Sequence, residues 1–302
     1  MDKLGDLDVF ARIVAARSMS AAGRELGLSP AVVSKRMRRL EERLGVRLLQ
    51  RTTRQLALTE VGRGFHERVA AILAAVEEAE AWAMSGSAEV RGLLRVSAPT
   101  SFGRMHVAPH LVRFLEANPK LEVELVLSDA FVDIVGEGFD VAVRIADLTD
   151  SSLIARKLAP NHRILVASPS YLAAHGLPAS LDDLARHTLL VHGGGEWRLE
   201  GPDGPVSVKV TTPLRTNSSE VVREAVLAGA GIALRSTWDV GPELQSGKLA
   251  RVLPAYRSSP RVAVHAVYPS RRHLEQKTRA FVAFLVELYG ETPYWDAGLG
   301  MG

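Results

Sequence analysis

Apolar side chains recur with helical spacing at the start of the chain. They lie three or four positions apart at Leu4, Leu7, Val9, Phe10, Ile13 and Val14, which predicts an amphipathic helix. A short second helix is expected from Ser20, a suitable N-cap, to Leu26. The tight turn of residues 27–29 follows it, and two helices joined by such a glycine-containing turn are typical of a helix-turn-helix.

The third helix of this region has an apolar and a polar face. Ser29 is the expected N-cap, Pro30 suits the first helical position, and Gly45 ends the helix. The apolar positions follow a spacing of four, three and four at Val33, Met37, Leu40 and Leu44. The remaining edge is small, polar and basic: Ala31, Val32, Ser34, Lys35 and Arg38. Small residues allow close approach to bases and cations meet phosphates or guanine edges, so this edge is predicted to enter a major groove. Arg36 and Arg39 are left to phosphates or to Glu partners.

The stretch after Gly45 predicts a short hairpin. Residues 47–49 and 55–58 can pair, and the tip is basic and rich in hydroxyls: Arg51, Thr52, Thr53 and Arg54. A tip of this kind beside a helix-turn-helix is typical of a wing that contacts phosphates or a minor groove.

A long helix is expected from Glu60 to about Met84, capped by Thr59. Its apolar stripe consists of Phe65, Val69, Ile72, Leu73, Val76 and Trp82. Such a stripe either pairs two subunits, which we favour, or is buried against its own chain. The best linker candidate is residues 85–88, Ser-Gly-Ser-Ala.

From about Gly92 the pattern changes to alternating strands and helices, which predicts an α/β domain. The expected strands are 93–98, 121–127, 141–145, 164–167, 189–191, 231–234 and 261–267. The expected helices are 106–117, 132–137, 220–228 and 274–288. Ligands of such domains bind at the carboxyl ends of strands, near helix N-termini.

Charge is distributed unevenly along the 302 residues. Residues 17–68 hold twelve Lys and Arg against five Glu, a net charge of +7, whereas residues 69–90 hold four Glu and neither Lys nor Arg. This suggests a nucleic-acid contact confined to the N-terminal part, although chance surface variation is an equal alternative on charge alone. No Cys is present, which excludes disulfides and thiolate metal sites and fits a reducing compartment. The chain begins without a signal-peptide pattern and has no apolar stretch long enough for a membrane span, so a cytoplasmic protein without a membrane partner is expected.

Taken together, the motifs resemble the LysR-type transcriptional regulators. The resemblance rests on DLDVFARIVAARSMSAAGRELGLSPAVVSKRMRRLEERLGVRLLQRTTRQLALTEVG at the N-terminus. It extends through LRVSAPTSFGRMHVAPHL, GFDVAVRIADLTDSSLIARKL and VREAVLAGAGIALRS. The implied fold class is α+β multidomain: a winged helix-turn-helix (1–59), a linker and dimerisation helix (60–91) and a two-lobed α/β effector domain (92–302) that resembles periplasmic solute-binding proteins. The resemblance places 92–161 plus 268–302 in one lobe and 162–267 in the other, and implies a homodimer or homotetramer.

One position departs from the family pattern. Many members carry Gln-Pro-Ala where this chain has Pro30-Ala31-Val32. Because Pro30 cannot donate a hydrogen bond to a base, reading falls more heavily on Ser34, Lys35 and Arg38, while Ala31 and Val32 can touch thymine methyl groups. The predicted DNA-binding set is Ser20, Ser29, Pro30, Ala31, Val32, Ser34, Lys35, Arg36, Arg38, Arg51, Thr52, Thr53 and Arg54.

The effector implied by the family is expected between the lobes. The predicted contacts are Thr100, Ser101, Phe102, Arg144, Asn217 and Ser218. The amides of residues 101–103 suit a carboxylate at a helix start, so a small carboxylate or aromatic acid is expected. The alternatives are that residues 100–101 and 217–218 only cap helices and that Arg144 forms a structural salt bridge.

Other motifs are weak. Gly229 and Gly231 fit a helix-to-strand turn better than a phosphate loop, and HGGGEW at 192–197 fits a loop near the ligand, since no G-x-S-x-G accompanies it. The nine His show no HExxH spacing. We therefore expect no enzyme activity, metal or cofactor, and the alternative to a regulator is a solute-binding or carrier protein without a DNA role.

Overall fold

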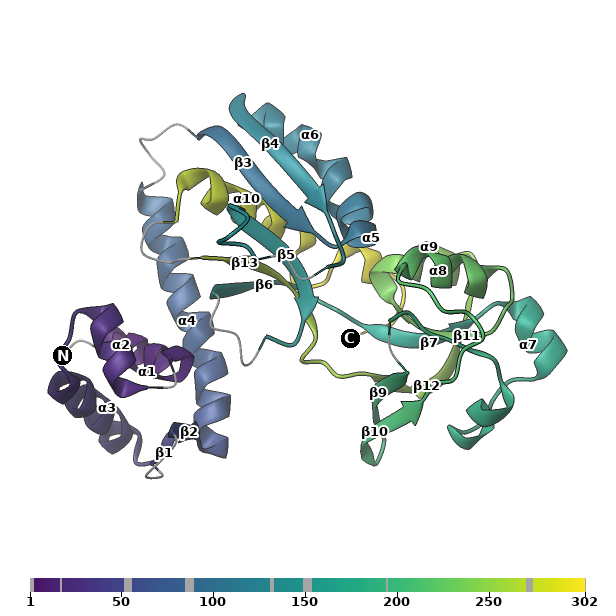
Figure 1. The fold of residues 1–302 in the computed structure, drawn as a ribbon, viewed down its shortest axis with the longest axis horizontal. Coiled ribbons are helices and arrows are strands. Elements are labelled where there is room, and N and C mark those ends of the chain that lie inside the picture. Colours follow the sequence, from purple (N-terminus) through teal and green to yellow (C-terminus); the bar gives the residue numbers. More distant parts are fainter. Residues whose placement is uncertain are drawn as a thin grey trace. The chain divides into compact units, whose positions relative to one another are not determined.

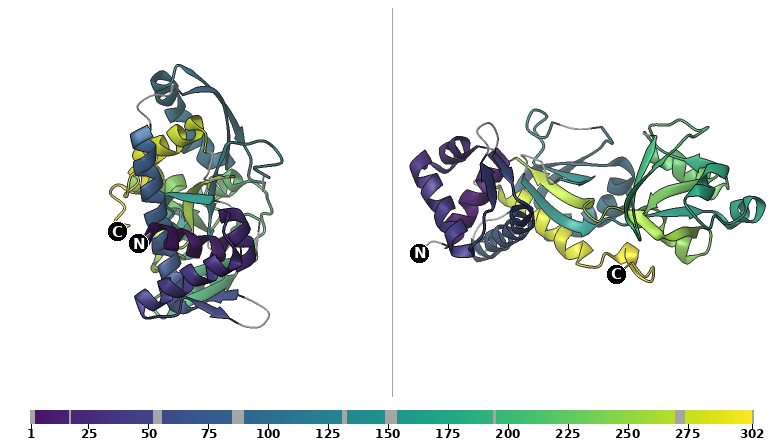
Figure 2. Two further views of the ribbon diagram at one scale, coloured as in Figure 1. Left: turned by 90° about the vertical axis from the view of Figure 1, so that its left-hand side faces the viewer. Right: turned by 90° about the horizontal axis from the view of Figure 1, so that it is seen from below.

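The computed structural model describes residues 3–16, 18–51, 56–84, 90–130, 133–148, 154–193, 195–269 and 274–301. The described residues form two compact units, one N-terminal and one that begins at Val90 (Figure 1). Figure 2 shows the ribbon from two further sides. Each unit has its own hydrophobic core.

The N-terminal unit is helical apart from one hairpin. Its elements are α1 (Lys3–Ala16), α2 (Met19–Leu26), α3 (Pro30–Leu44), β1 (Leu49–Arg51), β2 (Leu56–Leu58) and α4 (Glu60–Met84). The core contains Val9, Phe10 and Ile13 of α1 and Val33, Met37 and Leu40 of α3. The helical spacing in the sequence thus predicted the inward faces of both helices, except that Leu4 and Leu44 are exposed.

Helix α2 begins one residue earlier than predicted. Its N-cap is Ser18, whose Oγ accepts from the backbone N–H of Ala21, so the assignment of Ser20 as the cap was wrong. Gly27 ends the helix in the left-handed conformation, where glycine is favoured. The sequence signal was ambiguous because Ser18 and Ser20 are both good capping residues.

The apolar residues of helix α4 are partly buried and partly exposed. Thr59 caps the helix, with the N–H of Gly62 donating to the Thr59 Oγ1 at 2.9 Å. Val69 and Leu73 are buried in the core of their own unit, whereas Val61 and Ile72 are exposed. Burial against the same chain therefore accounts for part of the stripe, and pairing of subunits through the exposed part stays a prediction.

The second unit contains two sheets, each with its own helices. We call the parts built on them the first and second lobe. The first sheet has the order β4-β3-β5-β13-β6, with β3 parallel to β4 and β5. Its strands are β3 (Arg91–Ala98), β4 (Lys120–Leu127), β5 (Val141–Ala146), β6 (Ile154–Pro160) and β13 (Ala263–Tyr268). A continuous helical segment follows β3: α5 (Thr100–Phe102), a π-helix (Gly103–Val107), a 3-10 turn (Ala108–His110) and α6 (Leu111–Ala117).

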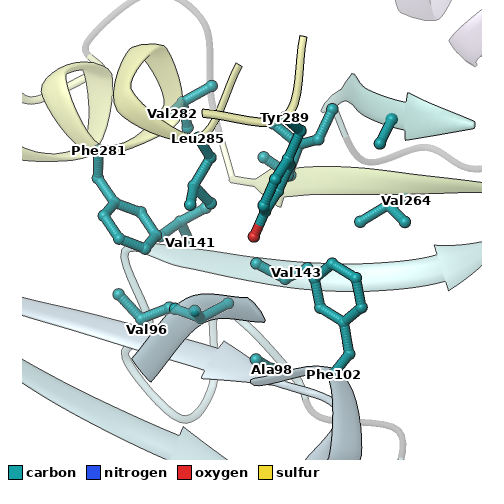
Figure 3. Packing of buried hydrophobic residues seen from close by; sticks show 14 of the residues in the cluster. Val96, Ala98, Phe102, Val141, Val143, Val264, Phe281, Val282, Leu285 and Tyr289 are labelled. Atoms are coloured by element: carbon teal, nitrogen blue, oxygen red, sulfur yellow. The ribbon is translucent and has the colours of Figure 1, made fainter. Parts of the chain in front are cut away.

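Helix α10 (Gln276–Tyr289) covers the same core as α6. Figure 3 shows Phe281, Leu285 and Tyr289 of α10 pointing toward the sheet residues around Val141 and Val143. Phe102 lies beside them (Figure 3). The start of the helical segment after β3 is thus anchored in the main core of the first lobe.

The second sheet has the order β10-β9-β12-β7-β11-β8. Its strands are β7 (Arg163–Ala167), β8 (Leu189–Leu190), β9 (Glu196–Gly201), β10 (Gly204–Lys209), β11 (Ile232–Ser236) and β12 (Ala250–Ser258). The helices are α7 (Pro169–His175), a 3-10 helix (Asp182–Arg186), α8 (Ser219–Leu227) and α9 (Thr237–Gln245), and a last 3-10 turn lies at Tyr294–Asp296. The antiparallel hairpin β9–β10 begins inside the predicted HGGGEW loop, and Trp197 is buried, so that loop prediction was wrong for residues 196–197.

The boundary between the lobes differs from the predicted one in two places. Strand β13 pairs with β5 and β6, so residues 263–267 belong to the first lobe and not to the second. At the other end, Leu299 and Met301 pack with Ile164 and Val222 in the core of the second lobe. The chain therefore returns to the second lobe after α10, which alternation of apolar residues could not indicate.

Two smaller predictions also changed. Residues 134–138 form turns in place of the helix predicted at 132–137, of which Val132 lies outside the described residues. Asp133 organises the turns because its Oδ1 accepts from the N–H of Gly136 at 3.0 Å. Across the described residues, no helix is both long and apolar enough to cross a membrane.

Candidate DNA-binding surface and effector site

The N-terminal half of α3 presents the predicted reading edge. Ser29 accepts from the N–H of Val32 through its Oγ and Pro30 occupies the first turn, as predicted. Four residues of this edge are exposed: Ala31, Val32, Lys35 and Arg38. Ser34 is half-buried between them and the core face. The arrangement offers two small apolar contacts and two cations on one side of a helix, which suits the major groove.

Arg39 does not belong to this edge. Its Nε donates to the Oδ2 of Asp6 at 3.0 Å, and its Nη2 contacts the other oxygen of the same carboxylate. Asp6 is only 1% exposed, so the bidentate pair fastens α3 to α1. Arg39 was predicted to meet either DNA phosphates or a glutamate. It has an acidic partner, but this partner is an aspartate of α1 and not a glutamate. Arg36 is half-buried.

A buried carboxylate fixes the hairpin against α3. Glu41 Oε1 accepts from the N–H groups of Leu48 and Leu49 at 2.8 and 3.1 Å, while Oε2 pairs with Arg47. Glu41 is therefore a positioning residue for the start of β1. This role could not be predicted from the sequence, because a glutamate in the last turns of a basic helix is normally exposed to solvent.

The predicted hairpin forms, but its first strand lies two residues later than expected: β1 spans Leu49–Arg51, with Leu49 opposite Leu58 and Arg51 opposite Leu56, so Arg51 belongs to the strand and not to the tip. Of the predicted tip, Thr52, Thr53 and Arg54 lie outside the described residues, as does the side chain of Arg51. Ser20 is exposed on α2. The roles of these residues at DNA stay predictions.

Some of the groups predicted to bind the effector at residues 100–103 already have hydrogen-bond partners within the chain. The N–H of Thr100 donates to Asp129 Oδ1 at 2.9 Å, and the N–H of Gly103 donates to the carbonyl of Pro99 at 2.7 Å. Ser101 is 3% exposed, and its Oγ has no hydrogen-bond partner within the described residues. The side chain that accepts at the start of α5 is Asp129, and the N-cap residue Pro99 has no capping side chain, so the alternative of simple side-chain capping by Thr100 or Ser101 finds no support.

The side chain of Phe102 is not available to an effector, and a contact through the Phe102 N–H stays a prediction. Phe102 has no exposed surface and lies within 6 Å of the rings of Trp238, Tyr289 and Trp295. Its position in the first helical turn points it at the sheet and not at the space before the helix (Figure 3).

Arg144 lies on β5 in a row of basic residues. Its Nη2 donates to Ser97 Oγ at 3.3 Å and its Nη1 to the carbonyl of Val143 at 3.0 Å. The cross-strand neighbours are His265 on β13 and then Lys157 on β6. Burial lowers the pKa of the Arg144 guanidinium, and no carboxylate among the described residues forms an ion pair with it. The alternative of a structural salt bridge for Arg144 thus finds no partner in the part of the chain that is described.

The start of α8 holds the other predicted pair. Asn217 is exposed and Ser218 is half-buried at the N-cap position. The Ser218 side chain makes no capping hydrogen bond, and its N–H donates to Thr216 Oγ1 at 3.0 Å. Capping therefore does not account for the Ser218 hydroxyl.

The structure brings the starts of the two helical segments together. Arg104 donates to Glu220 Oε1 through Nε at 3.1 Å and through Nη2 at 3.0 Å. These residues are 116 positions apart, one in each lobe. The candidate residues of the first lobe at 100–101 and those of the second lobe at 217–218 are each within four positions of this ion pair.

The described residues contain no group of three or more His, Cys, Asp or Glu that could hold a metal ion. The polar groups near the Arg104–Glu220 pair include hydroxyls, amides and a guanidinium group, together with the carboxylates of Glu220 and Asp129 that already bind Arg104 and the N–H of Thr100. Hydroxyls, amides and guanidinium groups recognise anions by hydrogen bonding.

Known proteins match the chain over nearly its whole length. The family model for the bacterial regulatory helix-turn-helix proteins of the LysR family matches residues 4–63, and that for the LysR substrate-binding domain matches residues 87–290. A solute-binding protein without a DNA role, the alternative reading of the sequence, would lack the first match.

Similar proteins are regulators. The chain is 43% identical over 297 residues to the HTH-type transcriptional regulator DmlR of Escherichia coli K12, covering 95% of each protein. It is 39% identical over 287 residues to the HTH-type transcriptional activator TtdR of the same strain, covering 93% of this chain and 91% of TtdR.

Solved structures agree with the fold. CrgA, a LysR-type transcriptional regulator of Neisseria meningitidis, matches with a TM-score of 0.67 and 33% identity over 94% of this chain and 97% of CrgA. The full-length Vibrio cholerae virulence activator AphB matches with a TM-score of 0.60 and 30% identity over 94% of this chain and 99% of AphB. With a helix-turn-helix, a two-lobed α/β domain and relatives of this kind, the chain belongs to the LysR-type transcriptional regulators.

Proposed function

We propose that this regulator recognises its operator with the exposed edge of α3. When a small anion binds between the lobes, the way in which the regulator binds and bends the operator changes. Ala31 and Val32 contact thymine methyl groups, and Ser34, Lys35 and Arg38 meet base edges or phosphates. Ser20, Ser29, Pro30 and Arg36 support this contact, and the wing (Arg51, Thr52, Thr53 and Arg54) follows the phosphate backbone. The exposure of Lys35 and Arg38 beside two small residues supports the DNA part.

The effector part rests on one observation, the Arg104–Glu220 ion pair. It places the start of α5 and the start of α8 beside each other although they belong to different lobes. An anion held there by Thr100, Ser101, Asn217 and Ser218, with Arg144 as the cation, contacts both lobes at once. A ligand that contacts both lobes stabilises one lobe arrangement over others, which is the requirement for a switch.

The expected ligand is a small carboxylate or aromatic acid. Ser101 Oγ and the Arg144 guanidinium support this class, because neither has an acidic partner among the described residues and both gain from a carboxylate ligand. The shift in lobe arrangement then alters how paired DNA-binding units span and bend the operator. The exposed residues Val61 and Ile72 of α4 support a homodimer, or a homotetramer built from dimers. A bacterial regulator of this family is expected to act in the cytoplasm.

A ligand screen tests the effector part. The melting temperature of the full chain is measured against small carboxylates and aromatic acids, since a ligand of the folded state raises it by mass action. A hit is repeated on Arg144→Gln and on the control Arg113→Gln, which removes an exposed cation of the same lobe. The proposal expects the stabilisation to disappear only in Arg144→Gln.

DNA footprinting with and without the hit then tests the switch. An altered footprint or bend supports it. If no small anion stabilises the protein, or if a stabilising anion leaves the footprint unchanged, the effector part is wrong while the DNA part stands.

A further inference from the structure

The C-terminal segment after α10 is bound to the second lobe. Gln245 of α9 donates through Nε2 to the carbonyl of Ala297 at 2.8 Å, and Leu299 and Met301 pack into the core beneath α8 and α9. The segment also approaches α9 closely at Gly241, where a Cβ atom would lie 2.9 Å from the carbonyl oxygen of Trp295. Only glycine fits this contact without displacement of the segment.

The same segment is bound to the first lobe through its aromatic residues. The ring of Trp295 lies 4.6 Å from that of His106 and 5.8 Å from that of Phe102. Tyr294 lies 5.6 Å from His106 and 5.8 Å from His110. Residues 294–301 therefore contact both lobes by side chains that pack closely.

A directed chain of hydrogen bonds runs from this segment to His106 of the first lobe and from His106 to the second lobe. His106 Nε2 lies 2.9 Å from the carbonyl oxygen of Trp238 in α9, which can only accept, so Nε2 carries the proton. The other ring nitrogen, Nδ1, then accepts from the hydroxyl of Tyr294 at 2.6 Å. His110 Nε2 lies 3.3 Å from the same hydroxyl and donates to it. Burial lowers the pKa of His106 to about 4, which agrees with a neutral ring that accepts at Nδ1.

His106 belongs to the segment that begins at the proposed effector contacts. It lies in the π-helix Gly103–Val107, directly after Thr100 and Ser101. A π-helical turn has an extra residue per hydrogen-bonded ring and is uncommon, and such turns occur frequently at functional sites. A change at Ser101 is thus five residues away from the bonds that hold the second lobe.

We propose that residues 294–301 form an interlobe clamp and that Tyr294, by holding His106, is the positioning residue that couples the effector segment to the second lobe. The role in switching rests on the proposed function, whereas the clamp itself does not require a ligand. The clamp stabilises the arrangement of the two lobes in this structure. An effector either stabilises this arrangement further or favours a different one.

Hydrogen exchange of the full chain without ligand tests the clamp from its first-lobe end. Tyr294→Phe removes the hydroxyl and keeps the ring. Amides of residues 103–107 and 237–241, one stretch in each lobe, are expected to exchange about five- to tenfold faster, as for the loss of one hydrogen bond. The control Tyr171→Phe removes a hydroxyl that binds the N–H of Thr188 within the second lobe. It is expected to accelerate exchange near residue 188 only.

The second-lobe end is tested by Gly241→Ala, whose new methyl group displaces Trp295. It is expected to accelerate the same two stretches. Gly64→Ala in α4 is the matched control, because its methyl group meets only the end of the Arg68 side chain, at 3.4 Å.

Unchanged exchange at residues 103–107 in both clamp variants would overturn the proposal, and so would uniform acceleration over the whole second unit. The former means that the segment does not couple the lobes, the latter that it only stabilises the fold. Because no effector is present, a failed ligand screen leaves this result untouched. Conversely, failure of the clamp leaves the proposed effector site standing.

Discussion

Helix α3 and the helical segment that starts at Thr100 both present polar residues at a helix start, yet they are built differently. Helix α3 is a regular α-helix with a serine cap, a glycine stop and two carboxylates, Asp6 and Glu41, that fasten it to its neighbours. The segment after β3 has no cap from its own N-cap residue and passes through α, π and 3-10 geometry within eleven residues. Phe102 and the N–H of Thr100 are anchored in their own lobe, whereas the ring of His106 is held by the other lobe and by the C-terminal segment.

The difference suits two tasks. A reading helix must hold its side chains at fixed positions against base edges, and rigid local anchors provide this. The helical segment at residues 100–117, which we call the coupling segment, must have more than one arrangement available. Mixed helical geometry with distant anchors provides that. The following changes test this contrast, from the largest expected effect to the smallest.

Removing the carboxylate that positions the hairpin is expected to have the largest effect. Glu41→Ala leaves the buried N–H groups of Leu48 and Leu49 without an acceptor, and we expect a loss of about 3 kcal/mol in the free energy of unfolding of the N-terminal unit. Urea unfolding followed by circular dichroism measures it. Glu42→Ala, at an exposed neighbour, is the control, and an equal loss in both variants would contradict a fixed anchor at Glu41.

Acidification should weaken the coupling segment and spare the reading helix. The pKa of His106 is about 4 in the folded chain because of burial, against 6.5 for a free histidine, so the unfolded state takes up the proton first. The stabilisation by neutral His106 is complete above pH 6.5 and lost as the pH falls toward 4, with about 2 kcal/mol lost at pH 5. Urea unfolding between pH 7.5 and 4.5 shows the loss in the wild-type chain. If the stability of the His106→Gln variant depends on pH in the same way as that of the wild-type chain, His106 is not the cause of the loss.

Arg38→Ala tests the reading edge. We expect a cost of about 1–3 kcal/mol at the cognate operator if the guanidinium meets a base. Fluorescence anisotropy at several salt concentrations separates this from loss of a phosphate contact, which would weaken all sequences alike. Arg43→Ala, in the last turn of α3, is the control, and affinity that is unchanged by Arg38→Ala at low and moderate salt would take Arg38 out of the interface.

Two serines give the smallest and most direct contrast. Ser29→Ala removes the cap of α3 and should cost about 1 kcal/mol in the free energy of unfolding. Ser101→Ala removes a buried hydroxyl that has no partner among the described residues, and should stay within about 0.5 kcal/mol of the wild-type chain. Thermal unfolding of both variants checks the pair, and a larger cost at Ser101 would mean that its hydroxyl is a structural group.

The sequence predicted the N-terminal unit well because its signals are local. The ends of α3 are marked by residues that lie at those ends: Ser29 and Pro30 at the start and Gly45 at the stop. The spacing of Val33, Met37 and Leu40 identifies the face that packs in the core. Asp6 and Glu41 were missed because their partners lie 33 and seven positions away in the sequence. A distant partner leaves no mark on the pattern of one segment.

The second unit was predicted less completely for the same reason. Strand β12 contains Pro254 and a positive φ at Leu253, and α9 contains Pro242, so both elements lack the regular pattern that identifies them. Phe102 was assigned to the ligand because its amide lies at a helix start, while the burial of its ring depends on Trp238 and Trp295 from other parts of the chain. The sequence did indicate both helix starts that Arg104 and Glu220 join.

The return of the chain to the second lobe has a mechanical consequence. The lobes are connected covalently after Pro160, after Ser258 and again after Tyr289. Each covalent connection limits how far the lobes can twist or slide past each other, and a third connection limits these motions further than the first two alone. The C-terminal segment therefore narrows the range of lobe motions that is open to an effector.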